Sequence, residues 1–228
     1  MNDRPASGFP DQRVGGSGLA AAGLSVVVLP AVLPQIMYDA APPLPSPSGA
    51  PLLAARLTLR PYLPSDASAF YQLIQDNRLR LRPAFPAREA SVQTPADAGQ
   101  VLAQFRQDWA AGRLYVLGIW HTATGHYLGD ISLKPNWTAP VTLEIGYYLA
   151  AAAEGHGYAR EALAAVVEFG FGPLRAARLL IRCRATNPRS CAVAEAVGFQ
   201  PLAPRPRPWP LRALASSDIL YYYLKREQ

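Results

Sequence analysis

One stretch, residues 144–171, constrains the fold of this chain more than any other. It reads as an apolar strand, a short alanine-rich link, a loop that contains Gly155 and Gly157, and an apolar helix. Glycine permits the turns that such a loop needs, and the first N–H groups of a helix have no partners within the helix. These donors and the positive end of the helix dipole predict a site for an anion such as a pyrophosphate. The alternative is a tight strand-to-helix connection that binds nothing.

Hydrophobic periodicity predicts the elements around this stretch. The expected elements are, in chain order, a strand over residues 56–60, helices over 66–77 and 95–112, strands over 114–121, 127–134 and 141–149, a helix over 157–171, a strand over 179–185, a helix over 188–197, and strands over 199–203 and 219–225. Residues 78–93 show no clean period and are expected to form a loop that lines a substrate cleft, together with the proline-rich residues 204–217.

Short turns join the three middle strands, which predicts an antiparallel meander, and the strand after the long helix is expected to run parallel to the strand before it. The fold class is therefore α+β, an α/β three-layer arrangement in which helices flank a mixed, mostly antiparallel sheet.

Residues 1–53 differ in composition from the rest and are expected to form a low-complexity, disordered extension with a proline-rich linker, ahead of one domain over residues 54–228. Two prolines interrupt the apolar residues 19–37, so the uninterrupted part is too short to span a bilayer. A signal peptide is one explanation of this stretch. We favour another, in which Met37 is the true start of the protein, because acidic residues and glycines precede the apolar run.

Charge and cysteine content narrow the classes of function. The net charge of +6 suits an anionic small ligand or an acidic partner, but no run of basic residues favours nucleic acid. Cys183 and Cys191 lie eight residues apart, with no Cys-x-x-Cys and no histidine at metal-ligand spacing. We therefore expect no metal site, no membrane partner, and two reduced thiols in a cytoplasmic protein.

Two short sequence motifs follow one another in the second half of the chain. Residues 154–159 read Glu-Gly-His-Gly-Tyr-Ala, and Asn187-Pro-Arg-Ser190 is followed by Gly198-Phe199. With the order of elements, these motifs resemble the GNAT acyl-CoA N-acyltransferases. The first is similar to the superfamily's pyrophosphate loop, Gln/Arg-x-x-Gly-x-Gly/Ala, and the second to the Asn-x-x-Ser and Gly-Phe of the RimJ/RimL type, which acetylates protein N-terminal amines. The resemblance covers about residues 54–227.

The resemblance implies the GNAT fold, with a parallel strand pair that splays apart, and transfer of an acetyl group from acetyl-CoA to a primary amine in a ternary complex. The splayed strand end is expected to hold the pantetheine arm and to polarise the thioester carbonyl through backbone N–H groups. The residues implied there are Tyr147, Tyr148 and Leu149. Asn187 is expected to hold the pantetheine arm too, and can cap a helix at the same time. The residues implied for the pyrophosphate are Gly155, His156, Gly157, Tyr158, Ala159 and Arg160.

Three residues are candidates for proton transfer. Glu144 is the candidate general base, because it lies on the strand that presents the thioester and because apolar surroundings make a carboxylate a better base. The alternative is an ordinary strand carboxylate that faces outward. Ser190, from the motif, and Tyr221 are candidates for protonating the thiolate, although Tyr221 is one of three adjacent tyrosines that can serve packing alone.

Glu154 departs from the family pattern, which has Gln or Arg at this position. An acid beside a pyrophosphate site costs about 1 kcal/mol in partly exposed surroundings, and Arg160 can offset it. The alternative functions are a catalytically weak acyl-CoA-binding or regulatory module with this fold, and a basic domain that contacts ribosomal RNA. The resemblance implies that the acceptor is a protein N-terminus or a small amine, and the protein is expected to be a monomer or a homodimer.

Overall fold

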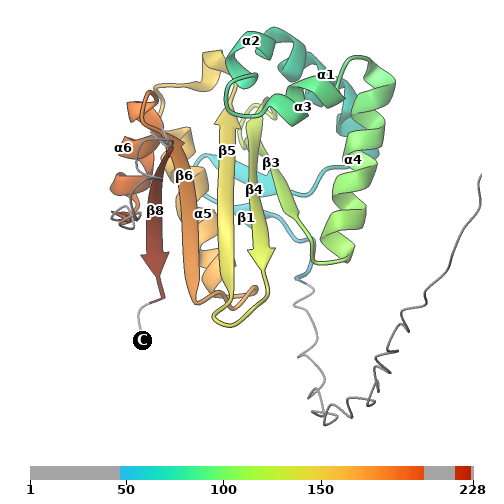
Figure 1. Ribbon diagram of the computed structural model, residues 1–228. Coiled ribbons are helices and arrows are strands. Elements are labelled where there is room, and N and C mark those ends of the chain that lie inside the picture. Colours follow the sequence, from blue (N-terminus) through green and yellow to red (C-terminus); the bar gives the residue numbers. More distant parts are fainter. Residues whose placement is uncertain (1–46, 203–218, 227–228) are drawn as a thin grey trace, which may run out of the picture. The chain divides into compact units, whose positions relative to one another are not determined.

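A computed structural model describes residues 47–202 and 219–226 (Figure 1). The strands are β1 (Leu52–Leu53), β2 (Leu57–Arg60), β3 (Tyr115–His121), β4 (Tyr127–Asn136), β5 (Thr142–Leu149), β6 (Arg178–Arg184), β7 (Gln200–Pro201) and β8 (Ile219–Lys225). The α-helices are α1 (Ala67–Asp76), α2 (Arg78–Leu81), α3 (Pro86–Ser91), α4 (Pro95–Ala110), α5 (Tyr158–Phe171) and α6 (Pro188–Ala196). Short 3-10 helices are η1 (Pro64–Asp66) and η2 (Ala151–Ala153). The expectations for residues 1–46 and 204–217 lie outside the described residues.

The described strands form one sheet in the order β1-β2-β3-β4-β5-β6-β8-β7. Every neighbouring pair is antiparallel except β5 and β6, which are parallel and are joined by α5. The predicted meander and the parallel crossover are therefore confirmed, as is the α+β fold class. β1 was not predicted, since two residues carry no periodicity.

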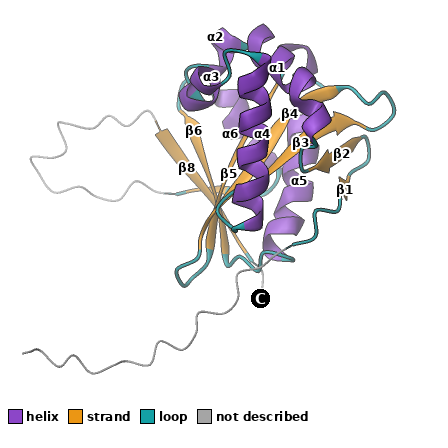
Figure 2. Ribbon diagram, turned by 90° about the vertical axis from the view of Figure 1, so that its right-hand side faces the viewer, coloured by secondary structure: helices purple, strands orange, loops and turns teal. Residues whose placement is uncertain are grey.

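Helices cover both faces of this sheet, which gives the three layers (Figures 1 and 2). On one face, α5 and α6 pack on a core that includes Leu143, Ile145, Leu179 and Ile181. On the other face, α1 and α4 pack with aromatic and aliphatic side chains of β3 and β5, among them Tyr148. Successive strand residues point to opposite faces, so β5 contributes its odd-numbered apolar residues to the first core.

Local sequence signals set the helix boundaries. Thr94 caps α4, because its hydroxyl accepts from the backbone N–H of Asp97 at 3.2 Å while the Asp97 carboxylate accepts from the N–H of Thr94 at 2.8 Å. Gly157, with a φ of 79°, precedes the first residue of α5. Asn187 occupies the same position before α6, and its side chain accepts from the N–H of Ser190 at 3.3 Å.

The prediction of a loop over residues 78–93 is wrong in part, because this segment contains the short helices α2 and α3. Tertiary contacts hold them. The guanidinium of Arg78 donates to the carbonyl of Val92 at 2.8 Å and pairs with Glu89 at 2.6 Å. Helices of four and six residues are too short to show a helical period or to form alone. Among the described residues, no helix is long and apolar enough to cross a membrane.

Candidate active site

The parallel strands β5 and β6 separate at one end. They pair from Thr142 with Arg178 to Ile145 with Ile181 and no further. β4 still pairs with β5 as far as Leu149, and β8 still pairs with β6 as far as Arg184. The last residues of both strands are therefore held only from their outer sides, and the predicted pantetheine residues Tyr147, Tyr148 and Leu149 lie on the separated part of β5.

The glycine loop follows β5 and leads into α5. Gly155 and Gly157 both have left-handed backbones, with φ of 83° and 79°. Within the described residues, no acceptor binds the backbone N–H groups of residues 155–160, and the next N–H, that of Glu161, donates to the carbonyl of Gly157 at 3.1 Å. The loop thus presents consecutive donors at the positive end of a 14-residue helix, an arrangement that binds phosphate oxygens.

The first turn of α5 is tied to the start of β2. Arg56 donates from its backbone N–H to the Glu161 carboxylate at 2.6 Å and pairs with it through its guanidinium at 2.8 Å. The guanidinium also lies 4.7 Å from the ring centroid of Tyr158, on which the ring of His156 stacks at 5.5 Å. Ala159 and Arg160 complete this turn. The predicted phosphate residues are therefore brought together on a fixed loop.

The charge of Glu154 is compensated, although by different residues than expected. Its carboxylate pairs with Arg80 of α2 and with Arg189 of α6, the latter at 2.7 Å. The expectation that Arg160 offsets Glu154 is wrong, since these two arginines hold both carboxylate oxygens. One acid and two cations leave the group with a net positive charge.

Ser190 and Tyr147 meet on the α5 and α6 face of the sheet. The Tyr147 hydroxyl lies 3.1 Å from Oγ of Ser190 and donates to the Ser190 carbonyl at 3.1 Å. Sγ of Cys183 lies 3.4 Å from the same Oγ. Burial raises the pKa of Tyr147 to about 12 and that of Cys183 to about 11, so both groups stay protonated at neutral pH.

Glu144 and Tyr221 lie on the opposite face. The Arg182 guanidinium contacts Oε1 of Glu144 at 2.5 and 2.6 Å, and Arg182 pairs across the sheet with Tyr221, whose side chain therefore shares its face. The surroundings of Glu144 are ionic and half exposed, with 38% of its side chain accessible, rather than apolar as expected. Within the described residues, Oε2 of Glu144 takes part in no hydrogen bond or ion pair.

A buried polar cluster lies behind the separated end of β5. Arg88 of α3 pairs with Asp130 of β4, which is 1% exposed and accepts from the Tyr62 hydroxyl at 3.0 Å. The Arg88 guanidinium also lies 3.4 Å from the Tyr148 hydroxyl. Burial and the Asp130 carboxylate raise the pKa of Tyr148 well above its usual range, so its hydroxyl stays protonated. Tyr148 is thereby fixed, and it turns its side chain away from Ser190.

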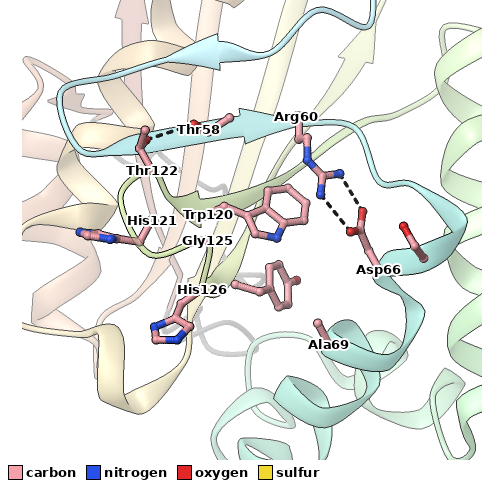
Figure 3. Close-up of a pocket in the computed structure, with 11 residues that line it drawn as sticks. Thr58, Arg60, Asp66, Ala69, Trp120, His121, Thr122, Gly125 and His126 are labelled. Carbon is pink, nitrogen blue, oxygen red and sulfur yellow. Dashed lines mark hydrogen bonds and ion pairs between the residues drawn. The ribbon is translucent and has the colours of Figure 1, made fainter.

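Two surface pockets lie around the turn between β3 and β4 rather than between the separated strands, and one of them reaches the glycine loop. One of about 440 Å³ is lined by His156 and Tyr158 and also by His121 and His126, so all three histidines of the chain surround it. The other, of about 610 Å³, shares His121 and His126 and extends over Trp120 (Figure 3).

The charged residues that line this larger pocket, Arg60 and Asp66, neutralise each other. The guanidinium of Arg60 stacks 3.7 Å from the Trp120 ring centroid and binds both carboxylate oxygens of Asp66, at 2.7 and 2.9 Å (Figure 3). Within residues 47–202 and 219–226, no group of three or more His, Cys, Asp or Glu side chains could hold a metal ion.

Sequence reasoning missed the partners of the candidate residues: Arg80, Arg88, Arg182 and Asp130. The alternation of β6 places Arg182 on the same face as Glu144 once the parallel pairing is known. Arg80 and Arg88 lie in the segment without a period, and no local signal identifies their partners.

Comparison with known proteins places these features in a class. Three solved structures have the same fold. One is the microcin C7 self-immunity acetyltransferase MccE in complex with acetyl-CoA and AMP, with a TM-score of 0.65, 21% identity, and coverage of 80% of this chain and 99% of that chain. The second is RimL, a ribosomal L7/L12 alpha-N-protein acetyltransferase, in complex with coenzyme A, with a TM-score of 0.64, 18% identity, and coverage of 77% and 98%. The third is a ribosomal-protein-S5-alanine acetyltransferase from Vibrio fischeri, with a TM-score of 0.66, 19% identity, and coverage of 77% and 96%.

The family follows from the sequence itself. Residues 56–200 match the acetyltransferase (GNAT) domain, and the chain belongs to this family. It is therefore an acetyltransferase, and acetyl-CoA is its co-substrate, as the resemblance implied. The separated strands and the free N–H groups of the loop fit this ligand, since they provide a place for the pantetheine arm and donors for the phosphates.

Proposed function

We propose that this chain is an N-acetyltransferase of the RimJ/RimL type, which transfers the acetyl group of acetyl-CoA to a primary amine. One observation carries the proposal: β5 and β6 separate directly before a loop with consecutive free N–H groups. When the phosphates of acetyl-CoA bind at residues 155–160, its pantetheine arm lies between the two strands. The thioester then lies beside Tyr147, Tyr148 and Leu149. Backbone donors there are proposed to polarise the carbonyl.

The reaction is a direct transfer within a ternary complex. The amine nitrogen attacks the thioester carbonyl carbon and forms the C–N bond, the C–S bond breaks, and its electron pair goes to sulfur. The amine loses one proton and the sulfur gains one, so that the products are an amide and CoA. Holding the two substrates in place supplies several kcal/mol of the rate enhancement, on the order of the known effects of proximity.

The two proton transfers are proposed to occur on opposite faces of the sheet. Oε2 of Glu144 accepts the amine proton on the α1 to α4 face, while Arg182 fixes the carboxylate through Oε1. Ser190 protonates the leaving thiolate on the α5 and α6 face, with the Tyr147 hydroxyl 3.1 Å away to restore its proton. Tyr221, on the Glu144 face and 42% exposed, remains the second candidate for this proton.

The acceptor is proposed to enter from the side of α2 and α3. Two of the structural neighbours are named as acetyltransferases of ribosomal proteins, which supports a protein N-terminus as the acceptor. MccE, named for self-immunity to a microcin, supports the alternative of a small-molecule amine. We also propose a cytoplasmic location and a monomeric or homodimeric state, which light scattering on purified protein will determine.

An acceptor screen tests the proposed reaction. Purified protein and acetyl-CoA are mixed with peptides that have free N-termini and with small amines, and release of the CoA thiol is followed. We expect amine-dependent release for at least one acceptor, with the acetyl group located on nitrogen by mass spectrometry. The same peptide with a blocked N-terminus is the control, and it should give no release.

The competing function is an acyl-CoA-binding module without catalysis. Glu154 first suggested it, because an acid at the phosphate loop weakens binding. The pairing of Glu154 with Arg80 and Arg189 reduces this objection without removing it, since the group carries a net positive charge while Glu154 occupies both arginines. Saturable CoA binding without amine-dependent thiol release from any acceptor would nevertheless favour the module over the enzyme.

A further inference from the structure

The Glu154 carboxylate bridges two arginines from different parts of the chain. Nη1 of Arg189, in the first turn of α6, lies 2.7 Å from Oε2, and Nη2 of Arg80, in α2, binds Oε1. Each guanidinium uses one terminal nitrogen, and within the described residues neither side chain makes another hydrogen bond. A guanidinium has five N–H donors, so both arginines keep donors for a further acceptor.

This bridge lies beside the donors of the phosphate loop. Glu154 directly precedes Gly155, where the free N–H groups begin. Arg189 lies between the cap Asn187 and Ser190, at the other side of the gap between β5 and β6. The Arg80 and Arg189 side chains are 52% and 77% exposed, so the bridge is in contact with water and each ion pair is weak.

We propose that Arg80 and Arg189 are phosphate-binding residues for acetyl-CoA, and that Glu154 is an internal anion that competes with the phosphates for them. The proposal rests on the proposed function for the identity of the ligand. Guanidinium groups bind carboxylate and phosphate oxygens through the same donors, so a bridge that fits a carboxylate also fits a phosphate oxygen. Glu154 thus keeps the two arginines together and at the same time lowers the affinity for CoA.

The bridge of Glu154 with Arg80 and Arg189 also connects the part of the protein proposed to bind the acceptor with the part proposed to bind acetyl-CoA. Arg80 belongs to α2, on the side proposed for the acceptor, whereas Arg189 belongs to the motif proposed for the pantetheine arm. When a phosphate group of acetyl-CoA replaces Glu154 as the anion shared by the two arginines, α2 becomes linked to the bound acetyl-CoA instead of to Glu154. Donor binding and the position of α2 are therefore coupled through these three side chains.

Calorimetric titration with CoA tests the competition. At low salt, Glu154→Gln is expected to bind CoA about 3- to 10-fold more tightly than the unchanged protein, the range that two weak ion pairs provide. The matched control is Asp108→Asn, which removes the same charge from a pair with Arg113, 2.7 Å apart, at the end of α4. This control should keep the original affinity. Glu154→Ala is the second variant, and thermal unfolding checks that each variant is folded.

Two further titrations locate the effect on the arginines and on phosphate. In an Arg80→Gln/Arg189→Gln background, CoA binds more weakly and Glu154→Gln gives no gain. S-acetylpantetheine, which lacks the nucleotide and its phosphates, binds all variants equally. Raising the salt concentration shrinks the gain, because these charges are exposed and salt screens them.

The outcomes separate this inference from the proposed function. If the unchanged protein transfers acetyl groups but Glu154→Gln and Glu154→Ala bind CoA no more tightly, or Asp108→Asn gives the same gain, only the competition is wrong. If Glu154→Gln tightens CoA binding and no amine is acetylated, the competition stands and the enzyme proposal fails. If folded protein and both Glu154 variants bind no CoA, both are overturned.

Discussion

At the scale of single residues, Gly155 and Gly157 set the backbone geometry of the phosphate loop. Gly157 has a φ of 79°, and a Cβ there would meet only the Arg56 guanidinium, at 3.6 Å. The cost of a side chain is therefore conformational, about 1 kcal/mol of unfolding free energy. We predict that Gly157→Ala lowers stability by that amount and weakens CoA binding, because relief of the strain turns the N–H donors.

Gly125 provides the control for this change. It has a φ of 68° and open space around it, in the turn between β3 and β4. Gly125→Ala should cost the same stability, measured by chemical denaturation, and keep the CoA affinity, measured by calorimetry. Equal CoA binding by both variants would contradict the role of the loop.

Glu144, the proposed general base, is the second residue whose substitution has a defined expected effect. Glu144→Gln keeps the size of the side chain and can still accept from Arg182, but it cannot take a proton. We predict that the rate of acetyl transfer falls about 10²-fold, the lower range for general-base catalysis, while CoA affinity stays the same. Glu168→Gln, an exposed change on α5, is the control and should keep the full rate. A rate within about twofold of the original would remove Glu144 from the mechanism.

At the scale of elements, α4 depends on its capping box. Hydrogen bonds from the backbone and the hydroxyl of Thr94 lower the pKa of Asp97, and the Thr94 hydroxyl in turn binds the N–H of Asp97. We predict that Thr94→Ala lowers the free energy of unfolding by about 1 kcal/mol, measured by urea denaturation. Ser68→Ala, at an exposed position within α1, should leave it unchanged or slightly higher. Equal stability of the two variants would show that the cap contributes nothing.

The long elements could be predicted because each shows its own period. α4 and α5 have apolar residues at helical spacing, α4 has a capping box and α5 begins after Gly157, and the three middle strands are separated by short turns. α2 and α3 could not be predicted from the sequence, because no helical period marks them. They are held by the pair of Arg78 with Glu89 and by the buried pair of Arg88 with Asp130. The pair of Arg88 with Asp130 joins residues far apart in the sequence, and nothing in the local pattern indicates either contact.

At the scale of the whole domain, the sheet separates two cores, and the candidate site lies where the parallel strands β5 and β6 part. The order of elements predicted the parallel crossover from β5 through α5 to β6, and this crossover is confirmed, while the position of the acetyl-CoA site beside it stays a prediction. The charges around it were not predictable in the same way. The pairs of Glu154 with Arg80 and of Glu144 with Arg182 depend on which side chains the fold brings within reach.

Burial of protonated groups predicts how the domain responds to alkali. Burial raises the pKa of Cys183 to about 11, whereas a thiol in an unfolded chain has a pKa of about 8.5. The folded state therefore holds a proton that the unfolded state loses, so the contribution is complete below about pH 8.5 and falls as pH rises toward 11. Tyr147 acts in the same direction at higher pH.

We predict a loss on the order of 2 kcal/mol of unfolding free energy between pH 8.5 and 11, measured by denaturation at a series of pH values. Cys183→Ser removes the thiol and should flatten the first part of the fall. An equally steep fall in this variant would mean that other groups cause it.

The central claim is that the gap between β5 and β6 and the loop after β5 form an acetyl-CoA site. Calorimetric titration of acetyl-CoA into the purified, folded protein tests it most directly. We predict saturable binding of one molecule per chain, which weakens with Gly157→Ala and persists with Gly125→Ala. No binding to protein shown to be folded would contradict the account.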